Sequence, residues 1–246
     1  MNQREKNIIE NCSNNALGMD DTFQFKCREC GKCCQNREDI MLTARDLHRM
    51  AAELGRTMEY IVRRYCEVYI GESSRIPIVR LKPSGINRVC PLLRGKRCLV
   101  HKSKPTICAL YPLGRAILFD PADIGAPGSK LVYFHQPTSC GEKTQPHTVS
   151  GWLNKFGLPI EDEFHSLWTD AIMFVSEFSQ NAESTETPKK TLEQLWETAF
   201  FELYINYATE EDLIPQFRAN MARLQGWLAQ TACRPAGSSG GSCDGE

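Results

Sequence analysis

The sequence predicts an α+β fold, in which a cysteine-rich domain of short strands, loops and helices is followed by a helical C-terminal region. Three observations support this prediction. The chain has 12 cysteines among 246 residues, and most of them lie in its first 140 positions. Short β-like runs between residues 76 and 136 are separated by proline, glycine and serine. After residue 147, apolar residues recur at the spacing of a helix face.

The composition is that of a globular protein with one large domain or two small ones. Apolar residues make up 41% of the chain and charged residues 24%. No apolar run approaches the roughly 20 residues that a membrane-spanning helix needs, and the N-terminal segment lacks the apolar core of a secretory signal. We therefore expect a cytoplasmic protein without membrane contact, in a compartment where thiols stay reduced.

Two helices are expected before residue 72. Thr43 would cap the first and Gly55 would end it, while Thr57 would cap the second and Gly71 would end it, with Cys66 inside the helix. The first helix has four apolar residues on one face, namely Leu47, Met50, Ala51 and Leu54.

Strands are expected next, at 76–82, 97–101, 115–119 and 130–136, with a loop from Pro121 to Lys130.

The later part of the chain reads as helical. A wide apolar stripe runs from Phe164 to Phe178. Thr191 and Gln194 have the spacing of a capping box for a second helix. A last helix is expected over 213–232.

The strongest signal is a cysteine motif. Cys27, Cys30, Cys33 and Cys34 form the pattern C-x2-C-x2-C-C, and a second group follows at Cys90, Cys98, Cys108 and Cys140. A two-residue spacer lets two thiolates converge on one metal, and Gly31 frees the backbone for that turn. In a reducing compartment such clusters bind metal more often than they form disulfides, so we expect metal ligands among these eight cysteines.

Four thiolates suit zinc or an iron–sulfur cluster. The C-x2-C-x2-C run and the later Cys90-Pro91 pair resemble ferredoxin spacing, which favours an iron–sulfur cluster of the 4Fe-4S type, with zinc as the alternative. That analogy predicts two ligand sets. The first set is Cys27, Cys30, Cys33 and Cys90. The second set is Cys34, Cys98, Cys108 and Cys140. Cys33 and Cys34 would point to opposite faces if the backbone were extended.

Other residues near the motif have ordinary interpretations. Cys12, Cys66, Cys233 and Cys243 are expected to be bystanders, and His101 is expected to lie outside the ligand set. Four basic residues surround the second cysteine group and could offset thiolate charge, bind phosphate or nucleic acid, or be solvated surface residues. These are Arg88, Arg94, Lys96 and Arg97.

These features divide the chain into four segments. We expect residues 1–21 to be a flexible N-terminal arm, 22–147 a cysteine-cluster metal-binding domain, 148–233 a helical C-terminal region, and 234–246 a disordered tail. Residues 1–146 carry 23 Lys and Arg against 15 Asp and Glu, for a net charge of +8. Residues 147–246 carry 6 against 15, for a net charge of −9. The asymmetry is consistent with an anionic ligand in the first half, or with attraction between the two halves.

The motifs resemble those of the CxxCxxCC (YkgJ-type) family of zinc- or iron-chelating domains. The resemblance rests on CRECGKCC at 27–34, CPLL at 90–93, CLVH at 98–101 and KPTICALYP at 104–112, and covers roughly residues 24–155. Ala109 stands where the family usually has arginine, and Cys140-Gly141 where it tends to have C-P-G. The resemblance implies metal binding. The family includes flagellin lysine N-methylases that look like iron–sulfur proteins, so an enzyme that transfers methyl groups is one option.

The sequence therefore predicts a metal-binding protein with one or two iron–sulfur clusters, used in electron transfer or cofactor-dependent catalysis. The alternative is a zinc-stabilised binding module or a metal chelator without enzymatic activity. Such a module would have an anionic partner such as nucleic acid. No redox or protein partner follows from the sequence, and it contains no nucleotide-binding loop and no hydrolase or metalloprotease motif.

Overall fold

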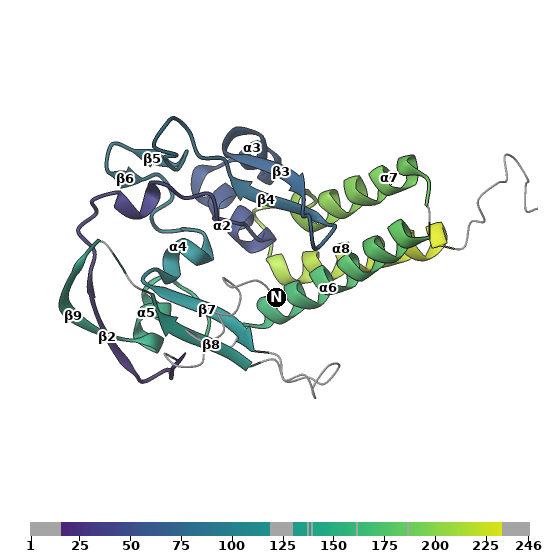
Figure 1. Cartoon of the computed structure of the whole chain (residues 1–246). Helices are drawn as coiled ribbons and strands as arrows, with labels where there is room; N and C mark the ends of the chain where they lie inside the picture. The colour runs from purple at the N-terminus through teal and green to yellow at the C-terminus, as the bar shows by residue number, and fades with distance from the viewer. Residues whose placement is uncertain are drawn as a thin grey trace, which may run out of the picture.

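Short antiparallel strands form one end of the molecule and three long helices form the other (Figure 1). The structure is a computed structural model that describes residues 16–118, 130–136, 138, 140–160, 162–185 and 187–232. The expected N-terminal arm mostly precedes this part of the chain, the expected tail follows it, and most of the expected loop at 121–130 is not covered. No helix within the described residues is both long and apolar enough to cross a bilayer. The α+β fold class is confirmed.

Four small antiparallel sheets make up the strand-rich part. The first sheet has the order β1-β8-β7, and the others are the pairs β2-β9, β3-β4 and β5-β6. The strands are β1 (Ala16–Leu17), β2 (Thr22–Lys26), β3 (Cys66–Ile70), β4 (Pro77–Leu81), β5 (Leu93–Arg94), β6 (Arg97–Cys98), β7 (Leu113–Leu118), β8 (Lys130–His135) and β9 (Glu142–Thr148).

Two helices, α2 (Ala44–Leu54) and α3 (Met58–Tyr65), begin where the sequence predicts. The Thr43 and Asp46 side chains form a reciprocal capping box at the start of α2, and Gly55 ends α2 at φ 58°. The Thr57 side chain accepts a hydrogen bond from the Tyr60 amide at the start of α3.

The predicted end of α3 is wrong. The helix stops at Tyr65, and Cys66 begins strand β3, which pairs along its length with β4. Gly71 lies in the turn that follows β3, where its amide donates to the Ile76 carbonyl. Strand pairing with a buried partner outweighed the helical spacing of this segment.

Strands β2 and β9 are absent from the sequence predictions. In β2, Phe23 and Phe25 are buried and alternate with exposed polar residues, which is the period of a half-buried strand. Strand β9 has no apolar alternation and is defined by its pairing with β2. The predicted strand at 97–101 is shorter than expected, because only Arg97 and Cys98 pair.

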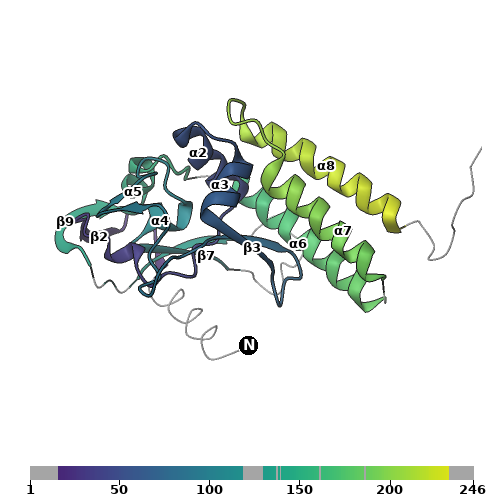
Figure 2. The same cartoon turned by 90° about the horizontal axis from the view of Figure 1, so that it is seen from above.

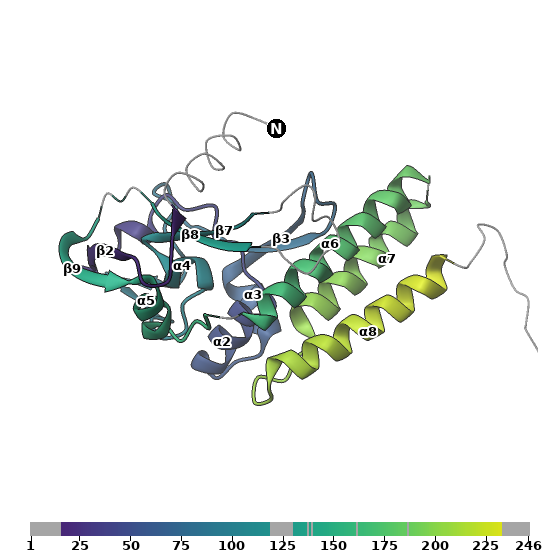
Figure 3. The same ribbon diagram turned by 90° about the horizontal axis from the view of Figure 1, so that it is seen from below.

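The helical C-terminal region is confirmed. It contains α5 (Val149–Lys155), α6 (Glu163–Ser184), α7 (Lys189–Phe200), the π-helical turn η3 (Phe201–Ile205) and α8 (Leu213–Ala232). The capping box predicted at Thr191 is wrong, because α7 begins at Lys189 directly after Pro188. Helices α6, α7 and α8 lie side by side, with α2 and α3 packed at one end of them (Figures 2 and 3).

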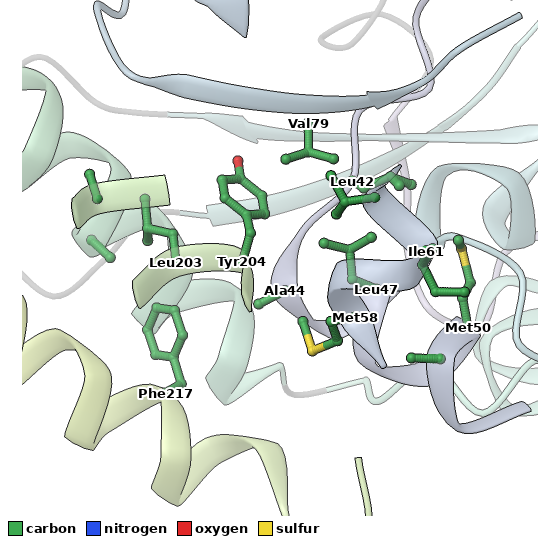
Figure 4. Close-up of a cluster of buried hydrophobic side chains, with 14 of the residues drawn as sticks. Leu42, Ala44, Leu47, Met50, Met58, Ile61, Val79, Leu203, Tyr204 and Phe217 are labelled. Atoms are coloured by element: carbon green, nitrogen blue, oxygen red, sulfur yellow. The ribbon is translucent and has the colours of Figure 1, made fainter. Parts of the chain in front are cut away.

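Two hydrophobic cores hold these parts together. The larger core joins α2, α3 and β4 to the long helices, with Leu47 and Val79 facing Leu203, Tyr204 and Phe217 (Figure 4). The smaller core joins β2 to α4 (Thr106–Leu110) and α5, around buried Trp152. Helix α5 therefore packs with the strand-rich part, and the site described below lies beside the smaller core.

A buried carboxylate links three elements between the two cores. Asp162 is the N-cap of α6, its side chain is 2% exposed, and it accepts hydrogen bonds from Arg45 of α2 and Arg115 of β7. Burial alone would raise the pKa of Asp162, but the two arginines more than offset this and lower it. The ion pairs fix α6 relative to the strand-rich part.

Candidate metal centre

The first cysteine group lies on a tight turn. Gly31 has φ 71°, a left-handed conformation that glycine adopts without strain, and it precedes the 3-10 turn η1 (Lys32–Cys34). Because the backbone is helical here, Cys33 and Cys34 do not point apart as an extended chain would require. Their Sγ atoms are 3.9 Å apart. The role predicted for Gly31 fits this geometry, whereas the expected divergence of Cys33 and Cys34 does not.

The next two cysteines reach the same turn through the β5–β6 hairpin. The Cys90 amide donates to the Cys34 carbonyl at 2.8 Å, and the Leu93 amide donates to the Cys90 carbonyl at 3.0 Å. Leu93 is in turn the strand partner of Cys98. Backbone bonds thus connect Cys34, Cys90 and Cys98 in one compact arrangement.

Cys108 is positioned by the short helix α4, which is held at both ends. At its start, Asp46 Oδ1 accepts hydrogen bonds from the Thr106 amide and hydroxyl, both at 2.7 Å. At its end, the Trp152 indole donates to the carbonyls of Ala109 and Leu110. Asp46 is 2% exposed, so these bonds are shielded from water. The capping residue of α2 therefore also fixes the element that carries Cys108.

Cys140 lies beside the start of the first motif. Lys26 of β2 pairs with Glu142 of β9, which brings the residues that follow Lys26 next to those that precede Glu142. Gly141 has φ 81°, and a Cβ atom there would lie 2.3 Å from the Phe25 ring, so only glycine fits. The Tyr111 hydroxyl is 3.2 Å from Cys140 Sγ.

All eight cysteines expected from the sequence line one cavity of about 670 Å³. Four separate stretches of the chain contribute them, and the turn η1, the β5–β6 hairpin, α4 and the start of β9 bring these stretches together. The eight are Cys27, Cys30, Cys33, Cys34, Cys90, Cys98, Cys108 and Cys140.

The donor set of the cavity fits a soft metal. Thiolates select zinc and iron–sulfur clusters, and eight of them face this space. Among the described residues, no three Cys, His, Asp or Glu side chains surround a common point at metal-ligand spacing in this conformation. The case for a metal centre therefore rests on the shared cavity and on the chemistry of its wall.

The surroundings of the cavity favour the thiolate form at Cys33, whereas burial raises the pKa of Cys90, Cys98, Cys108 and Cys140. A hydrogen bond with the neighbouring Cys34 lowers the pKa of Cys33, aided by the charges of Lys104 and Arg37, although burial acts in the opposite sense. Cys34 holds the shared proton, and its pKa is raised by that bond and by burial. Burial also raises the pKa of Cys108. Cys33 therefore ionises more readily than Cys34 or Cys108, and a bound cation would displace the protons of those two thiols.

The remaining cysteines stand apart from this wall. Cys66 is not part of the cavity, and burial raises the pKa of its thiol to about 12. Cys12, Cys233 and Cys243 lie outside the described residues. His101 and Tyr111 both line the cavity, and the sequence prediction missed Tyr111 although it belongs to the KPTICALYP motif that carries the resemblance.

Together, the fold and the cysteine-lined cavity define a metal-binding domain. Residues 26–141 match the family model CxxCxxCC, which is described as "Putative zinc- or iron-chelating domain". This part of the chain is similar to the CxxCxxCC family, and the resemblance predicted from its motifs is confirmed. No curated protein and no solved structure matches the chain.

Proposed function

We propose that the cavity holds iron–sulfur chemistry, in one or two clusters bound by the eight cysteines. The observation that carries this proposal is that eight thiols line one cavity of about 670 Å³. A single four-coordinate ion needs only four thiolates and little space around it, whereas clusters contain inorganic sulfide as well as iron. Such clusters would supply electron transfer or support catalysis.

The contacts favour two sets of four ligands. Backbone bonds join Cys34, Cys90 and Cys98, and the neighbouring Cys90 and Cys98 add to the effect of burial in raising the pKa of Cys108. These four residues form the inner set.

The other four residues form the outer set. Burial raises the pKa of Cys140, and the neighbouring thiols of Cys33, Cys30 and Cys27 add to that effect. The pairing of Lys26 with Glu142 also places Cys27 near Cys140. These sets differ from the ferredoxin-like prediction at two residues. Cys90 is now grouped with Cys34, Cys98 and Cys108, and Cys140 with Cys27, Cys30 and Cys33.

The basic side chains that line the cavity suit this chemistry. A four-thiolate centre carries net negative charge, and Lys104 and Arg37 lie close enough to lower the pKa of Cys33. Hydrogen bonds to cluster sulfur atoms raise a reduction potential. The Tyr111 hydroxyl, 3.2 Å from Cys140 Sγ, is placed to donate such a bond.

One observation favours zinc instead. Two thiolates bound at about 2.3 Å to one tetrahedral ion lie roughly 3.8 Å apart. The Sγ atoms of Cys33 and Cys34 are separated by 3.9 Å. Cysteines on different irons of a cluster are farther apart, so this pair matches two ligands of one ion. Under this second candidate function, the site would be structural and the protein a binding module or chelator.

Anaerobic purification distinguishes these two functions. We expect a brown protein whose iron and acid-labile sulfide are present in nearly equal amounts, measured together with zinc and the absorption spectrum on the same sample. A colourless protein with stoichiometric zinc and no sulfide, which also fails to take up iron and sulfide on reconstitution, would contradict the iron–sulfur proposal and support the zinc site.

A further inference from the structure

Aromatic rings line part of the cysteine cavity. Four aromatic rings contact one another in sequence along it, with centroid separations of 5.8 Å from Tyr111 to Phe25, 5.8 Å from Phe25 to Trp152 and 5.2 Å from Trp152 to Phe156. All four line the cavity. Apart from the Tyr111 hydroxyl, these rings offer no oxygen or sulfur to a metal. Such a lining is instead typical of an organic ligand pocket, and the cavity falls in the size range of such pockets.

Two lysines lie close to Phe156, the last ring of this series. The Lys104 Nζ atom lies 5.3 Å from the centre of the Phe156 ring, and the Lys155 Nζ atom lies 5.9 Å from the same ring. Lys155 also lies 4.8 Å from the centre of the Trp152 ring. Burial lowers the pKa of His101, and the charges of Lys104 and Lys155 also lower it. Lys155 of α5, together with Lys104 and His101 from the segment before α4, therefore lines the part of the cavity near Phe156.

The two lysines have no carboxylate partner of their own in the described part of the chain. Two of the three described arginines that line the cavity, Arg28 and Arg37, pair with Glu142 and Asp39. Of the residues that line the cavity, Glu29 is the single acidic one in the described ranges. Ammonium groups held together without an acid attract an anion.

One of these two lysines, Lys104, also acts on the cavity thiols. Lys104 lowers the pKa of Cys33 and Cys98, so part of its charge serves the metal centre. Lys155 does not contribute to the pKa shift resolved for any of the cavity thiols. Its charge faces the aromatic rings and His101, and it is free to act on a ligand.

We propose that the cavity binds a small organic anion beside the metal centre, with its carboxylate or phosphate group between Lys104 and Lys155. The apolar body of this ligand lies against Phe156, which is partly exposed, whereas Trp152 is buried beneath it. The site does not depend on which metal the cysteines hold, so it extends beyond the proposed function. Charge-assisted hydrogen bonds from the lysines give affinity, and the rings favour an anion that carries an apolar group.

Calorimetric titration of the full, metal-replete chain under anaerobic conditions tests this site. The probes are phenyl phosphate, benzoate and inorganic phosphate, in a buffer without other oxyanions. We expect phenyl phosphate or benzoate to bind more tightly than inorganic phosphate, with the tighter of the two identifying the anionic group. Lys155→Gln should weaken binding about 10-fold, which is the loss of one charge-assisted bond.

Matched variants separate this site from general charge and from the metal. Lys189→Gln removes the same charge from an exposed lysine of α7 and should leave binding unchanged. Phe156→Leu should reduce the preference for phenyl phosphate over inorganic phosphate. Metal content is measured on each variant. The proposal is overturned if no probe binds saturably, if Lys155→Gln binds within about 2-fold of the unmodified chain, or if Lys189→Gln weakens binding equally.

Discussion

Replacing Cys108 with serine (Cys108→Ser) is expected to remove about half of the bound metal, because it breaks one four-thiolate set and leaves the other intact. The charges of Cys90 and Cys98 act on Cys108, whereas the pairing of Lys26 with Glu142 places Cys27 near Cys140. Cys140→Ser should remove the other half, and the double variant should retain almost none. Iron, zinc and sulfide are quantified per chain for each variant after anaerobic purification.

Cys66→Ala is the matched control for these substitutions. It removes a thiol that is also poorly exposed to solvent but does not line the cavity, so metal content should not change. Circular dichroism spectra of all variants check that the fold is retained. If either single substitution removed all of the metal, the centre would be one unit shared by both groups. If Cys108→Ser retained full metal, Cys108 would not be a ligand.

Asp46→Asn is expected to lower the free energy of unfolding by about 3 kcal/mol and to weaken metal retention. The two carboxylate oxygens of Asp46 accept bonds from the amides and hydroxyls of Thr43 and Thr106. The amide oxygen of an asparagine can accept from one of these threonines. Its NH₂ group would then face the amide and hydroxyl donors of the other threonine. The start of α2 or α4 is then left with an unsatisfied buried amide, and Cys108 is no longer held in place. Urea unfolding and metal loss to a chelator measure the two effects.

Thr57→Ala provides the comparison for Asp46→Asn. Thr57 caps α3, and its loss should cost about 1 kcal/mol without changing the rate of metal loss. Equal chelator sensitivity in both variants would mean that Asp46 acts through overall stability alone.

The helix ends that depend on local chemistry were predictable from the sequence. Thr43 and Thr57 cap helices by satisfying amides within three residues, and Gly55 ends α2 by adopting a left-handed conformation. The end of α3 was not predictable in this way. Cys66–Ile70 has helical spacing, and its strand conformation comes from antiparallel pairing with β4, from Cys66 with Leu81 to Ile70 with Pro77.

The cysteines were found from their spacing, and the rest of the site was not. Strand β9 has no periodic signal, yet its pairing with β2 brings Cys140 to Cys27. Asp46 could be recognised as a capping residue, but its bond to Thr106 spans 60 residues. Lys104 and Lys155 both lie near the Phe156 ring only because α5 packs against the smaller core. Contacts of this range depend on the tertiary structure, which no local pattern encodes.

X-ray absorption at the metal edge of the anaerobically purified protein tests most directly whether the cysteines form the metal centre. We expect a first shell of about four sulfur atoms and no nitrogen or oxygen, at about 2.3 Å if the metal is zinc. An additional iron–iron scattering shell would be present for a cluster. A first shell dominated by nitrogen or oxygen would contradict the account, because it would mean that the metal binds outside the cysteine wall.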